Sequence, residues 1–135
     1  MTANRIMVVD DEAPIRGLFL KGFSRAGYRV YTADSAEEAI AMLPESACQV
    51  FFLDLYLPDM NGIDLCRQIR RTEPSTICYA VTGYDALYEL YEFRHAEFED
   101  YFIKPVSLAL LMAAAKSAFA KIESKEQPGG AVAVP

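Results

Sequence analysis

The chain has 135 residues, 53% of them hydrophobic, and a net charge of −6 at pH 7. This length fits one domain with a proper core, and two domains would be cramped. The acidic balance argues against direct nucleic-acid binding, which usually needs a basic surface. The start of the chain, MTANRIMVVDDE, has no basic segment followed by a long apolar run, and no segment approaches the roughly 18 apolar residues of a membrane span. We therefore expect no signal peptide and no membrane contact.

The first elements in the chain are a strand, a helix and a second strand. RIMVV (5–9) predicts a buried strand that ends at Asp10. Pro14 suits the first turn of a helix, whose apolar residues recur at helical spacing until it ends near Gly27. YRVYTA (28–33) alternates in polarity and predicts the second strand.

The middle of the chain repeats this order. Ser35, with Glu38 three residues later, is a capping-box pattern and predicts a helix through Leu43. QVFFLD (49–54) predicts the third strand, and the apolar spacing over 62–72 predicts the next helix, for which Asn61 is a candidate cap.

The last part adds two strands and two helices. TICYAV (76–81) predicts the fourth strand, and a helix is expected over 85–93. DYFI (100–103) predicts the fifth strand, after which Ser107 caps a long helix to Ile122. Residues 4–122 then form one domain, and residues 123–135 form a flexible tail or linker stub because they turn polar and then small.

Five strands alternating with five helices predict an α/β fold with a doubly wound parallel sheet. The strands are nearly continuous apolar runs, as expected when helices cover both sheet faces. The three cysteines, Cys48, Cys66 and Cys78, are odd in number and lack CxxC spacing. We therefore expect reduced, mostly buried thiols and a cytoplasmic protein.

Polar side chains follow four of the predicted strands. In an open parallel sheet the functional crevice lies outside the carboxyl ends of the strands. There the sequence places Asp10-Asp11-Glu12, Asp54, Thr82 and Lys104. Several carboxylates so close together repel one another unless a cation joins them. Hard oxygen ligands suit Mg²⁺, and an aspartate beside Mg²⁺ and a lysine stays ionised and nucleophilic, so these residues fit phosphoryl transfer to Asp54.

The segments VVDDE, FFLDLYLPDMNG, VTGY and DYFIKP together resemble the receiver domain of two-component response regulators. The intervals agree too: 43 residues from Asp11 to Asp54, 28 from Asp54 to Thr82, and 22 from Thr82 to Lys104. The resemblance spans residues 4 to 122. It implies the flavodoxin-like (βα)5 fold, a five-stranded parallel sheet with strand order 2-1-3-4-5.

The resemblance also implies a role for each matching residue. Asp54 is the expected phosphoacceptor, Asp11 a direct Mg²⁺ ligand, and Asp10 a ligand that acts largely through water. Asp54 and the backbone carbonyl of Tyr56 complete the protein's share of the metal shell.

The other matching positions belong to the expected switch. Thr82 and Tyr101 form a pair in which the hydroxyl turns to the phosphoryl group and the ring swings inward. Lys104 contacts the phosphoryl group, and the peptide bond before Pro105 is cis.

Two tyrosines occupy positions where family members vary. Tyr56 and Tyr84 lie two residues after Asp54 and two after Thr82. Both side chains flank the path of the water that hydrolyses the acyl phosphate. We therefore expect slow autodephosphorylation.

The expected function is that of a signalling switch with no turnover of an external substrate. A sensor histidine kinase or histidine phosphotransfer protein donates the phosphoryl group. The surface formed by the helix over 85–93, the strand over 100–103 and the last helix binds an output partner, which the sequence does not identify, or forms a homodimer. Acidic residues near this surface favour a basic partner.

Two alternatives belong to other classes. A phosphatase of the haloacid dehalogenase type also uses an aspartate after a strand, but it needs an acid where this chain has Tyr56, and there is no room for a cap domain. A phosphorylation-independent receiver-like binding module is the second, and a test with Asp54→Asn separates it from the switch.

Overall fold

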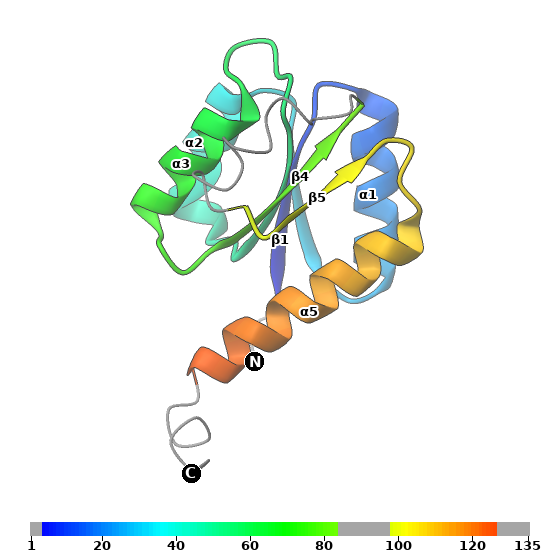
Figure 1. Ribbon diagram of the computed structural model, residues 1–135, viewed down its shortest axis with the longest axis vertical. Coiled ribbons are helices and arrows are strands. Elements are labelled where there is room, and N and C mark those ends of the chain that lie inside the picture. Colours follow the sequence, from blue (N-terminus) through cyan, green and yellow to red (C-terminus); the bar gives the residue numbers. More distant parts are fainter. Residues whose placement is uncertain (1–3, 84–97, 127–135) are drawn as a thin grey trace.

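The computed structural model describes residues 4–83 and 98–126, and in them one five-stranded parallel sheet has the order β2-β1-β3-β4-β5 (Figure 1). The predicted flavodoxin-like strand order is therefore confirmed. The elements are β1 Arg5–Val9, α1 Ala13–Arg25, β2 Arg29–Ala33, α2 Ala36–Ser46, β3 Val50–Asp54, α3 Gly62–Thr72, β4 Ile77–Thr82, β5 Asp100–Ile103 and α5 Leu108–Glu126.

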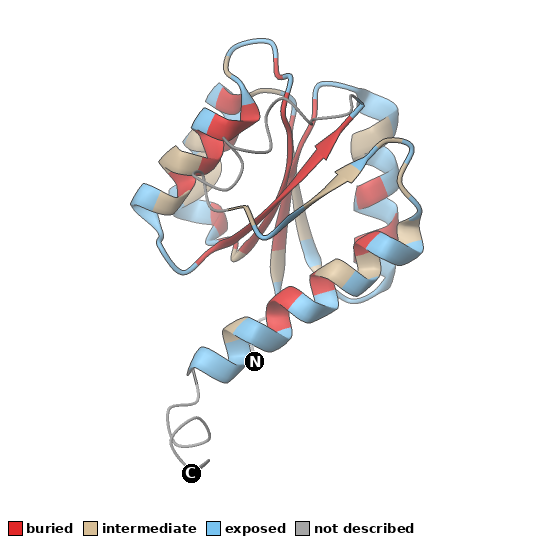
Figure 2. Ribbon diagram, in the orientation of Figure 1, coloured by how far each residue is buried: buried red, intermediate tan, exposed pale blue. Residues whose placement is uncertain are grey.

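The sheet buries a different set of side chains on each face, because successive residues of a strand point to opposite sides. The first set packs against α2 and α3 and is called the aliphatic face here; its strand members are Met7, Val9, Ala33, Phe51, Leu53, Cys78 and Ala80. The second packs against α1 and α5 and is called the aromatic face; its strand members are Ile6, Val8, Val50, Phe52, Ile77, Tyr79 and Val81. Figure 2 shows the central strands as the most continuously buried part of the molecule.

Most predicted boundaries agree with the structure to within one residue, and two helices run further than expected. The second helix was expected to stop at Leu43, but α2 continues through Pro44 to Ser46. Proline is tolerated there because only the last turn follows it. The C-cap is Ala47, whose N–H donates to the Leu43 carbonyl. The last helix reaches Glu126, four residues beyond Ile122.

Some expectations lie outside the described residues: the helix over 85–93 and Tyr84, one of the two proposed shielding tyrosines. Across residues 4–83 and 98–126, no helix combines the length and apolar character needed to cross a membrane.

Candidate functional site

The acidic residues predicted to converge do converge at the carboxyl ends of β1 and β3. These two strands are direct neighbours, with Val9 paired to Leu53, so the residues that follow them emerge side by side. Oxygen atoms of four carboxylates lie within 4.8 Å of one another: those of Asp10, Asp11, Glu12 and Asp54. Asp10 and Asp54 are buried, whereas Asp11 and Glu12 are exposed. The group therefore has a buried wall and an open side.

Lys104 supplies a cation to this acidic group from the end of β5. Its Nζ lies 2.7 Å from Asp10 Oδ2, 3.0 Å from Glu12 Oε2 and 3.3 Å from Asp54 Oδ2. The Lys104 backbone N–H donates to the Thr82 carbonyl at 2.7 Å, which ties the lysine to β4. One ammonium against four carboxylates leaves an excess of negative charge, which is the condition that attracts a divalent cation.

Burial and ion pairing leave the pKa of both Asp10 and Lys104 above its ordinary value. Burial raises the pKa of Asp10 above its ordinary value, although Lys104 and the Glu12 N–H work against the rise. Burial also lowers the pKa of Lys104, but its contacts with Asp10 and Glu12 outweigh that effect and leave the pKa above its ordinary value. Lys104 is thus a permanent cation at neutral pH.

The Asp54 carboxylate is held by the loop that follows it. The Tyr56 N–H donates to Asp54 Oδ1 at 3.0 Å, and the Gly62 N–H donates to the Leu55 carbonyl at 2.9 Å. A Cβ on Gly62 would lie 2.3 Å from the Asp54 carbonyl oxygen, so only glycine allows α3 to begin this close to β3. Asn61 caps α3, as predicted, by accepting from the Asp64 N–H at 2.8 Å. The segment from 55 to 61 is therefore a closed loop.

Thr82 and Tyr101 lie near the other side of the site. Thr82 is fully buried at the end of β4, and by strand alternation it belongs to the aliphatic face with Cys78 and Ala80. The half-buried Tyr101 packs against this same face. The Lys104–Pro105 peptide bond is cis, which is the isomer that the resemblance implies.

Two residues of this region were missed or misread from the sequence. Glu12 was noted after the first strand but given no role, and it pairs with Lys104. Asp59 was given no role from the sequence; it is exposed, and its carboxylate accepts from the backbone N–H groups of Ala36 and Glu37 at 3.0 and 2.9 Å. No local pattern reveals that contact, because its partners lie 22 and 23 residues earlier in the chain.

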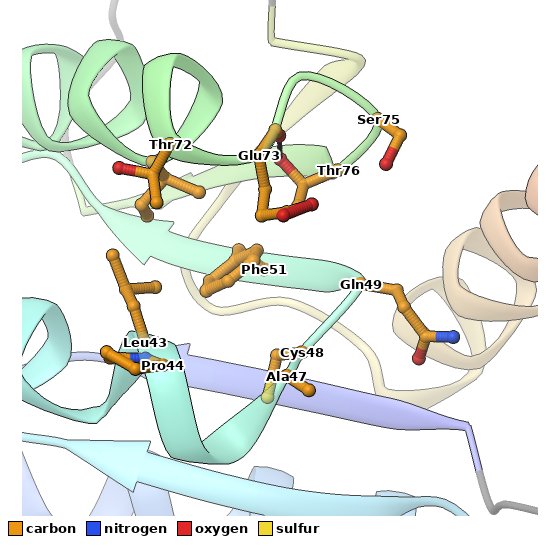
Figure 3. A pocket seen from close by; sticks show the side chains of 11 residues that line it. Leu43, Pro44, Ala47, Cys48, Gln49, Phe51, Thr72, Glu73, Ser75 and Thr76 are labelled. Carbon is orange, nitrogen blue, oxygen red and sulfur yellow. Dashed lines mark hydrogen bonds between the residues drawn. The ribbon is translucent and has the colours of Figure 1, made fainter.

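A cavity of about 410 Å³ lies at the opposite edge of the sheet, between the carboxyl ends of α2 and α3 (Figure 3). Phe51 lies between Leu43 and Pro44 on one side and Thr72 and Glu73 on the other. None of the predicted site residues lines this cavity. The charged site and the hollow are thus separate features.

Comparison with known protein families decides what the charged site belongs to. Residues 6–116 match the family model described as the response regulator receiver domain. The chain belongs to the response regulator receiver family. A receiver domain is a phosphoacceptor module of signalling proteins, and the family's partners are histidine kinases.

Curated relatives of this receiver domain are longer proteins. The transcriptional regulatory protein ResD of Bacillus subtilis is 36% identical over 103 residues, which cover 76% of this chain and 42% of ResD. The response regulator MprA of Mycobacterium sp. (strain KMS) is 29% identical over 124 residues, which cover 92% of this chain and 54% of MprA. The chain therefore spans about half the length of the curated relatives it matches.

Solved structures agree on the fold. A response regulator receiver domain protein from Methanospirillum hungatei JF-1 superposes with a TM-score of 0.88 at 27% identity, covering 92% of this chain and 99% of that one. The BeF3-activated DrrB receiver domain has a TM-score of 0.81 at 29% identity, covering 88% and 99%. Both agree with the order of the five strands.

Proposed function

We propose that Asp54 is the phosphoacceptor of this receiver domain and takes its phosphoryl group from a histidine kinase or a histidine phosphotransfer protein. The observation that carries the proposal is the position of Asp54, buried at the end of β3 with Oδ2 at 3.3 Å from Lys104 Nζ and Oδ1 bonded to the Tyr56 N–H. Two fixed contacts orient a carboxylate that the surrounding acids would otherwise repel.

The transfer is a displacement at phosphorus. A carboxylate oxygen of Asp54 attacks, the bond from phosphorus to the donor's histidine nitrogen breaks, and that nitrogen keeps the electron pair. The product is an acyl phosphate on Asp54. Lys104 stabilises the charge on the phosphoryl oxygens, because its ammonium is already oriented toward Asp54 before the group arrives.

Asp10, Asp11, Asp54 and the Tyr56 carbonyl are the residues we propose to hold Mg²⁺. The oxygen-only donor set and its excess negative charge fit that ion. When bound, Mg²⁺ neutralises charge on the phosphoryl oxygens.

We further propose that Thr82 and Tyr101 report phosphorylation to a partner. Their common position on the aliphatic face supports a coupled movement of hydroxyl and ring. The output surface would include β5 and α5, together with the segment before β5, and would bind a partner or a second copy of the chain.

The remaining parts of the proposal concern extent and location. We propose that the receiver domain comprises residues 4–122 and that the residues from 123 onward lead to a tail or a linker. The domain would assist its own phosphorylation and dephosphorylation without being an enzyme for an external substrate. Three buried free cysteines support a cytoplasmic location.

Acetyl phosphate with Mg²⁺, read by intact mass, tests the phosphoacceptor. We expect the parent chain to gain one phosphoryl group and Asp54→Asn to gain none. Lys104→Met should slow the reaction by about 100-fold, the usual cost of removing a group that stabilises developing charge. Glu73→Gln, at the opposite edge of the sheet, is the matched control and should react at the parent rate. A parent chain that stays unmodified by acetyl phosphate and unchanged by beryllofluoride would favour the phosphorylation-independent binding module.

The lifetime of the acyl phosphate is a separate part of the proposal. Tyr56 and Tyr84 would shield the phosphoryl group from water, so the double variant Tyr56→Asn, Tyr84→Ala should lose phosphate faster than the parent. A double variant that loses phosphate at the parent rate would show that the tyrosines do not shield it.

A further inference from the structure

Like every helix, α2 begins with backbone N–H groups that have no acceptor inside the helix, among them those of Ala36, Glu37 and Glu38. Ser35 accepts from the Glu38 N–H at 3.1 Å, and the Glu38 carboxylate accepts in turn from the Asp34 N–H at 2.9 Å. This local cap does not reach the N–H groups of Ala36 and Glu37. Both of these donate to the two oxygens of Asp59, one to each.

Asp59 therefore joins two segments that are distant in sequence. It lies in the closed loop 55–61 after β3, whose base is fixed by the Gly62 N–H and by the pairing of Tyr56 with Asn61. Its two bonds attach the far part of that loop to the start of α2. A carboxylate at a helix N-terminus is also favoured by the helix dipole. The hydrogen bonds from Glu37 and Ala36 hold the pKa of Asp59 below its ordinary value, so it is ionised at neutral pH.

The same start of α2 is tied to the acidic group. The Asp10 N–H donates to the Ala33 carbonyl at 3.1 Å, just before the cap of α2. The segment 33–37 thus holds the end of β1 through Ala33 and the loop after β3 through Asp59. The end of β1 and the loop after β3, which carry the proposed metal ligands, are therefore both hydrogen-bonded to the segment 33–37.

We infer that Asp59 is a positioning residue for the phosphorylation of Asp54. By binding the N–H groups of Ala36 and Glu37, it fixes the loop 55–61 relative to the end of β1. The Tyr56 backbone moves with that loop; its N–H is bonded to Asp54 and its carbonyl is a proposed Mg²⁺ ligand. The effect of Asp59 on Mg²⁺ binding rests on the proposed function. The effect of Asp59 on the loop rests on the geometry alone.

The loop effect is measured on the metal-free chain by amide hydrogen exchange of Tyr56, followed by NMR. Asp59→Ala removes both bonds and should speed this exchange about tenfold, because the loop opens locally more often. Asp59→Asn keeps one accepting oxygen and should fall between Asp59→Ala and the parent. Asp34→Asn is the matched control: it removes a charge from the same helix end, where its backbone N–H and not its carboxylate contributes to the cap. It should exchange at the parent rate.

The effect on the reaction is measured as the Mg²⁺ concentration that half-saturates phosphorylation by acetyl phosphate. Groups that orient metal ligands typically change metal affinity by about 10- to 100-fold, and Asp59 acts through a loop, so we expect about tenfold for Asp59→Ala. The rate at saturating Mg²⁺ should change less than this.

The two experiments separate the inference from the proposed function. A parent chain that is not phosphorylated refutes the proposed function, while the Tyr56 exchange still tests the loop. Parent-like Tyr56 exchange in Asp59→Ala, an unchanged Mg²⁺ requirement, or an equal effect of Asp34→Asn would overturn the role of Asp59.

Discussion

The two faces of the sheet are built from different side chains, although they share the same strands. The aromatic face contains a series of rings in contact. The ring centroids of Phe23 and Phe52 lie 5.2 Å apart, those of Phe52 and Tyr79 5.1 Å apart, and those of Tyr79 and Phe102 5.8 Å apart. The aliphatic face holds the cavity between α2 and α3, all three cysteines and the ring of Tyr101. Phe52 is thus surrounded by ring contacts on the aromatic face, whereas Phe51 borders the cavity on the aliphatic face.

We infer from this difference that the two faces have different structural roles. Rings in offset or edge contact add pairwise stabilisation to their buried area, so the aromatic face fixes the strands that end at the acidic group. The proposed switch residues Thr82 and Tyr101 lie on the aliphatic face, at the opposite end of its strands from the cavity. We expect stability to depend more on the aromatic face and adjustment on the aliphatic one.

Neighbouring phenylalanines in β3 give the largest test of this comparison. Phe51 and Phe52 are each 1% exposed but point to opposite faces. Phe52→Ala should reduce the free energy of unfolding by about 4 kcal/mol, since it removes buried area and several ring contacts. Phe51→Ala should cost about 3 kcal/mol, because its ring already borders a cavity.

Denaturant unfolding of both variants at one pH measures the difference. Phe51→Leu and Phe52→Leu serve as milder controls in case either alanine variant fails to fold. A larger cost at Phe51 than at Phe52 would contradict the assignment of the two faces.

Gly62 and Gly17 lie on helices that cover opposite faces of the sheet. Their alanine variants should change the free energy of unfolding less than the phenylalanine variants do, and in opposite directions. Gly62 begins α3, and an added Cβ would meet the Asp54 carbonyl oxygen at 2.3 Å. Gly62→Ala should therefore destabilise the fold by about 2 kcal/mol and disturb Asp54. Gly17 lies exposed inside α1 with no atom within 4 Å of such a Cβ, so Gly17→Ala should stabilise by about 0.7 kcal/mol.

Thermal unfolding together with the acetyl phosphate reaction measures both glycine variants. Gly17→Ala is the control for the added methyl group and should react at the parent rate. A Gly62→Ala chain with parent stability and parent reactivity would show that the close approach to Asp54 is not a constraint.

These contacts show where sequence reasoning succeeds and where it stops. The convergence of Asp10, Asp54 and Lys104 was predictable, because residues that follow parallel strands emerge at one edge of the sheet. The order of the strands came from the resemblance to receiver domains, since the apolar runs identify the strands but not their neighbours. The end of α2 was not predictable. Proline usually breaks a helix, but Pro44 lies in the last turn, where it is tolerated. The role of Asp59 was not predictable either. Its partners are backbone N–H groups, which are present at the start of every helix and leave no pattern in the residue types.

The hydroxyl of Tyr79 gives the most specific test of the aromatic face. Its hydroxyl donates to the Ala114 carbonyl at 3.0 Å, so Tyr79→Phe should cost about 1 kcal/mol at pH 8. Burial, helped by the charges of Glu99 and Asp100, raises the pKa of Tyr79 to about 12. The unfolded chain, with an ordinary tyrosine pKa of about 10, loses this proton first, so the stabilisation from Tyr79 is complete below pH 10 and is lost as the pH rises toward 12.

The difference in the free energy of unfolding between the parent and Tyr79→Phe should therefore shrink between pH 8 and pH 10.5. Denaturant unfolding of both chains in the same buffers measures it. Lysines titrate alike in both chains and cancel from the comparison. Tyr101→Phe, on the aliphatic face, is the matched tyrosine variant. If the difference in free energy of unfolding between Tyr101→Phe and the parent shrinks with rising pH as much as that of Tyr79→Phe, the loss of stability at high pH is not specific to the aromatic face.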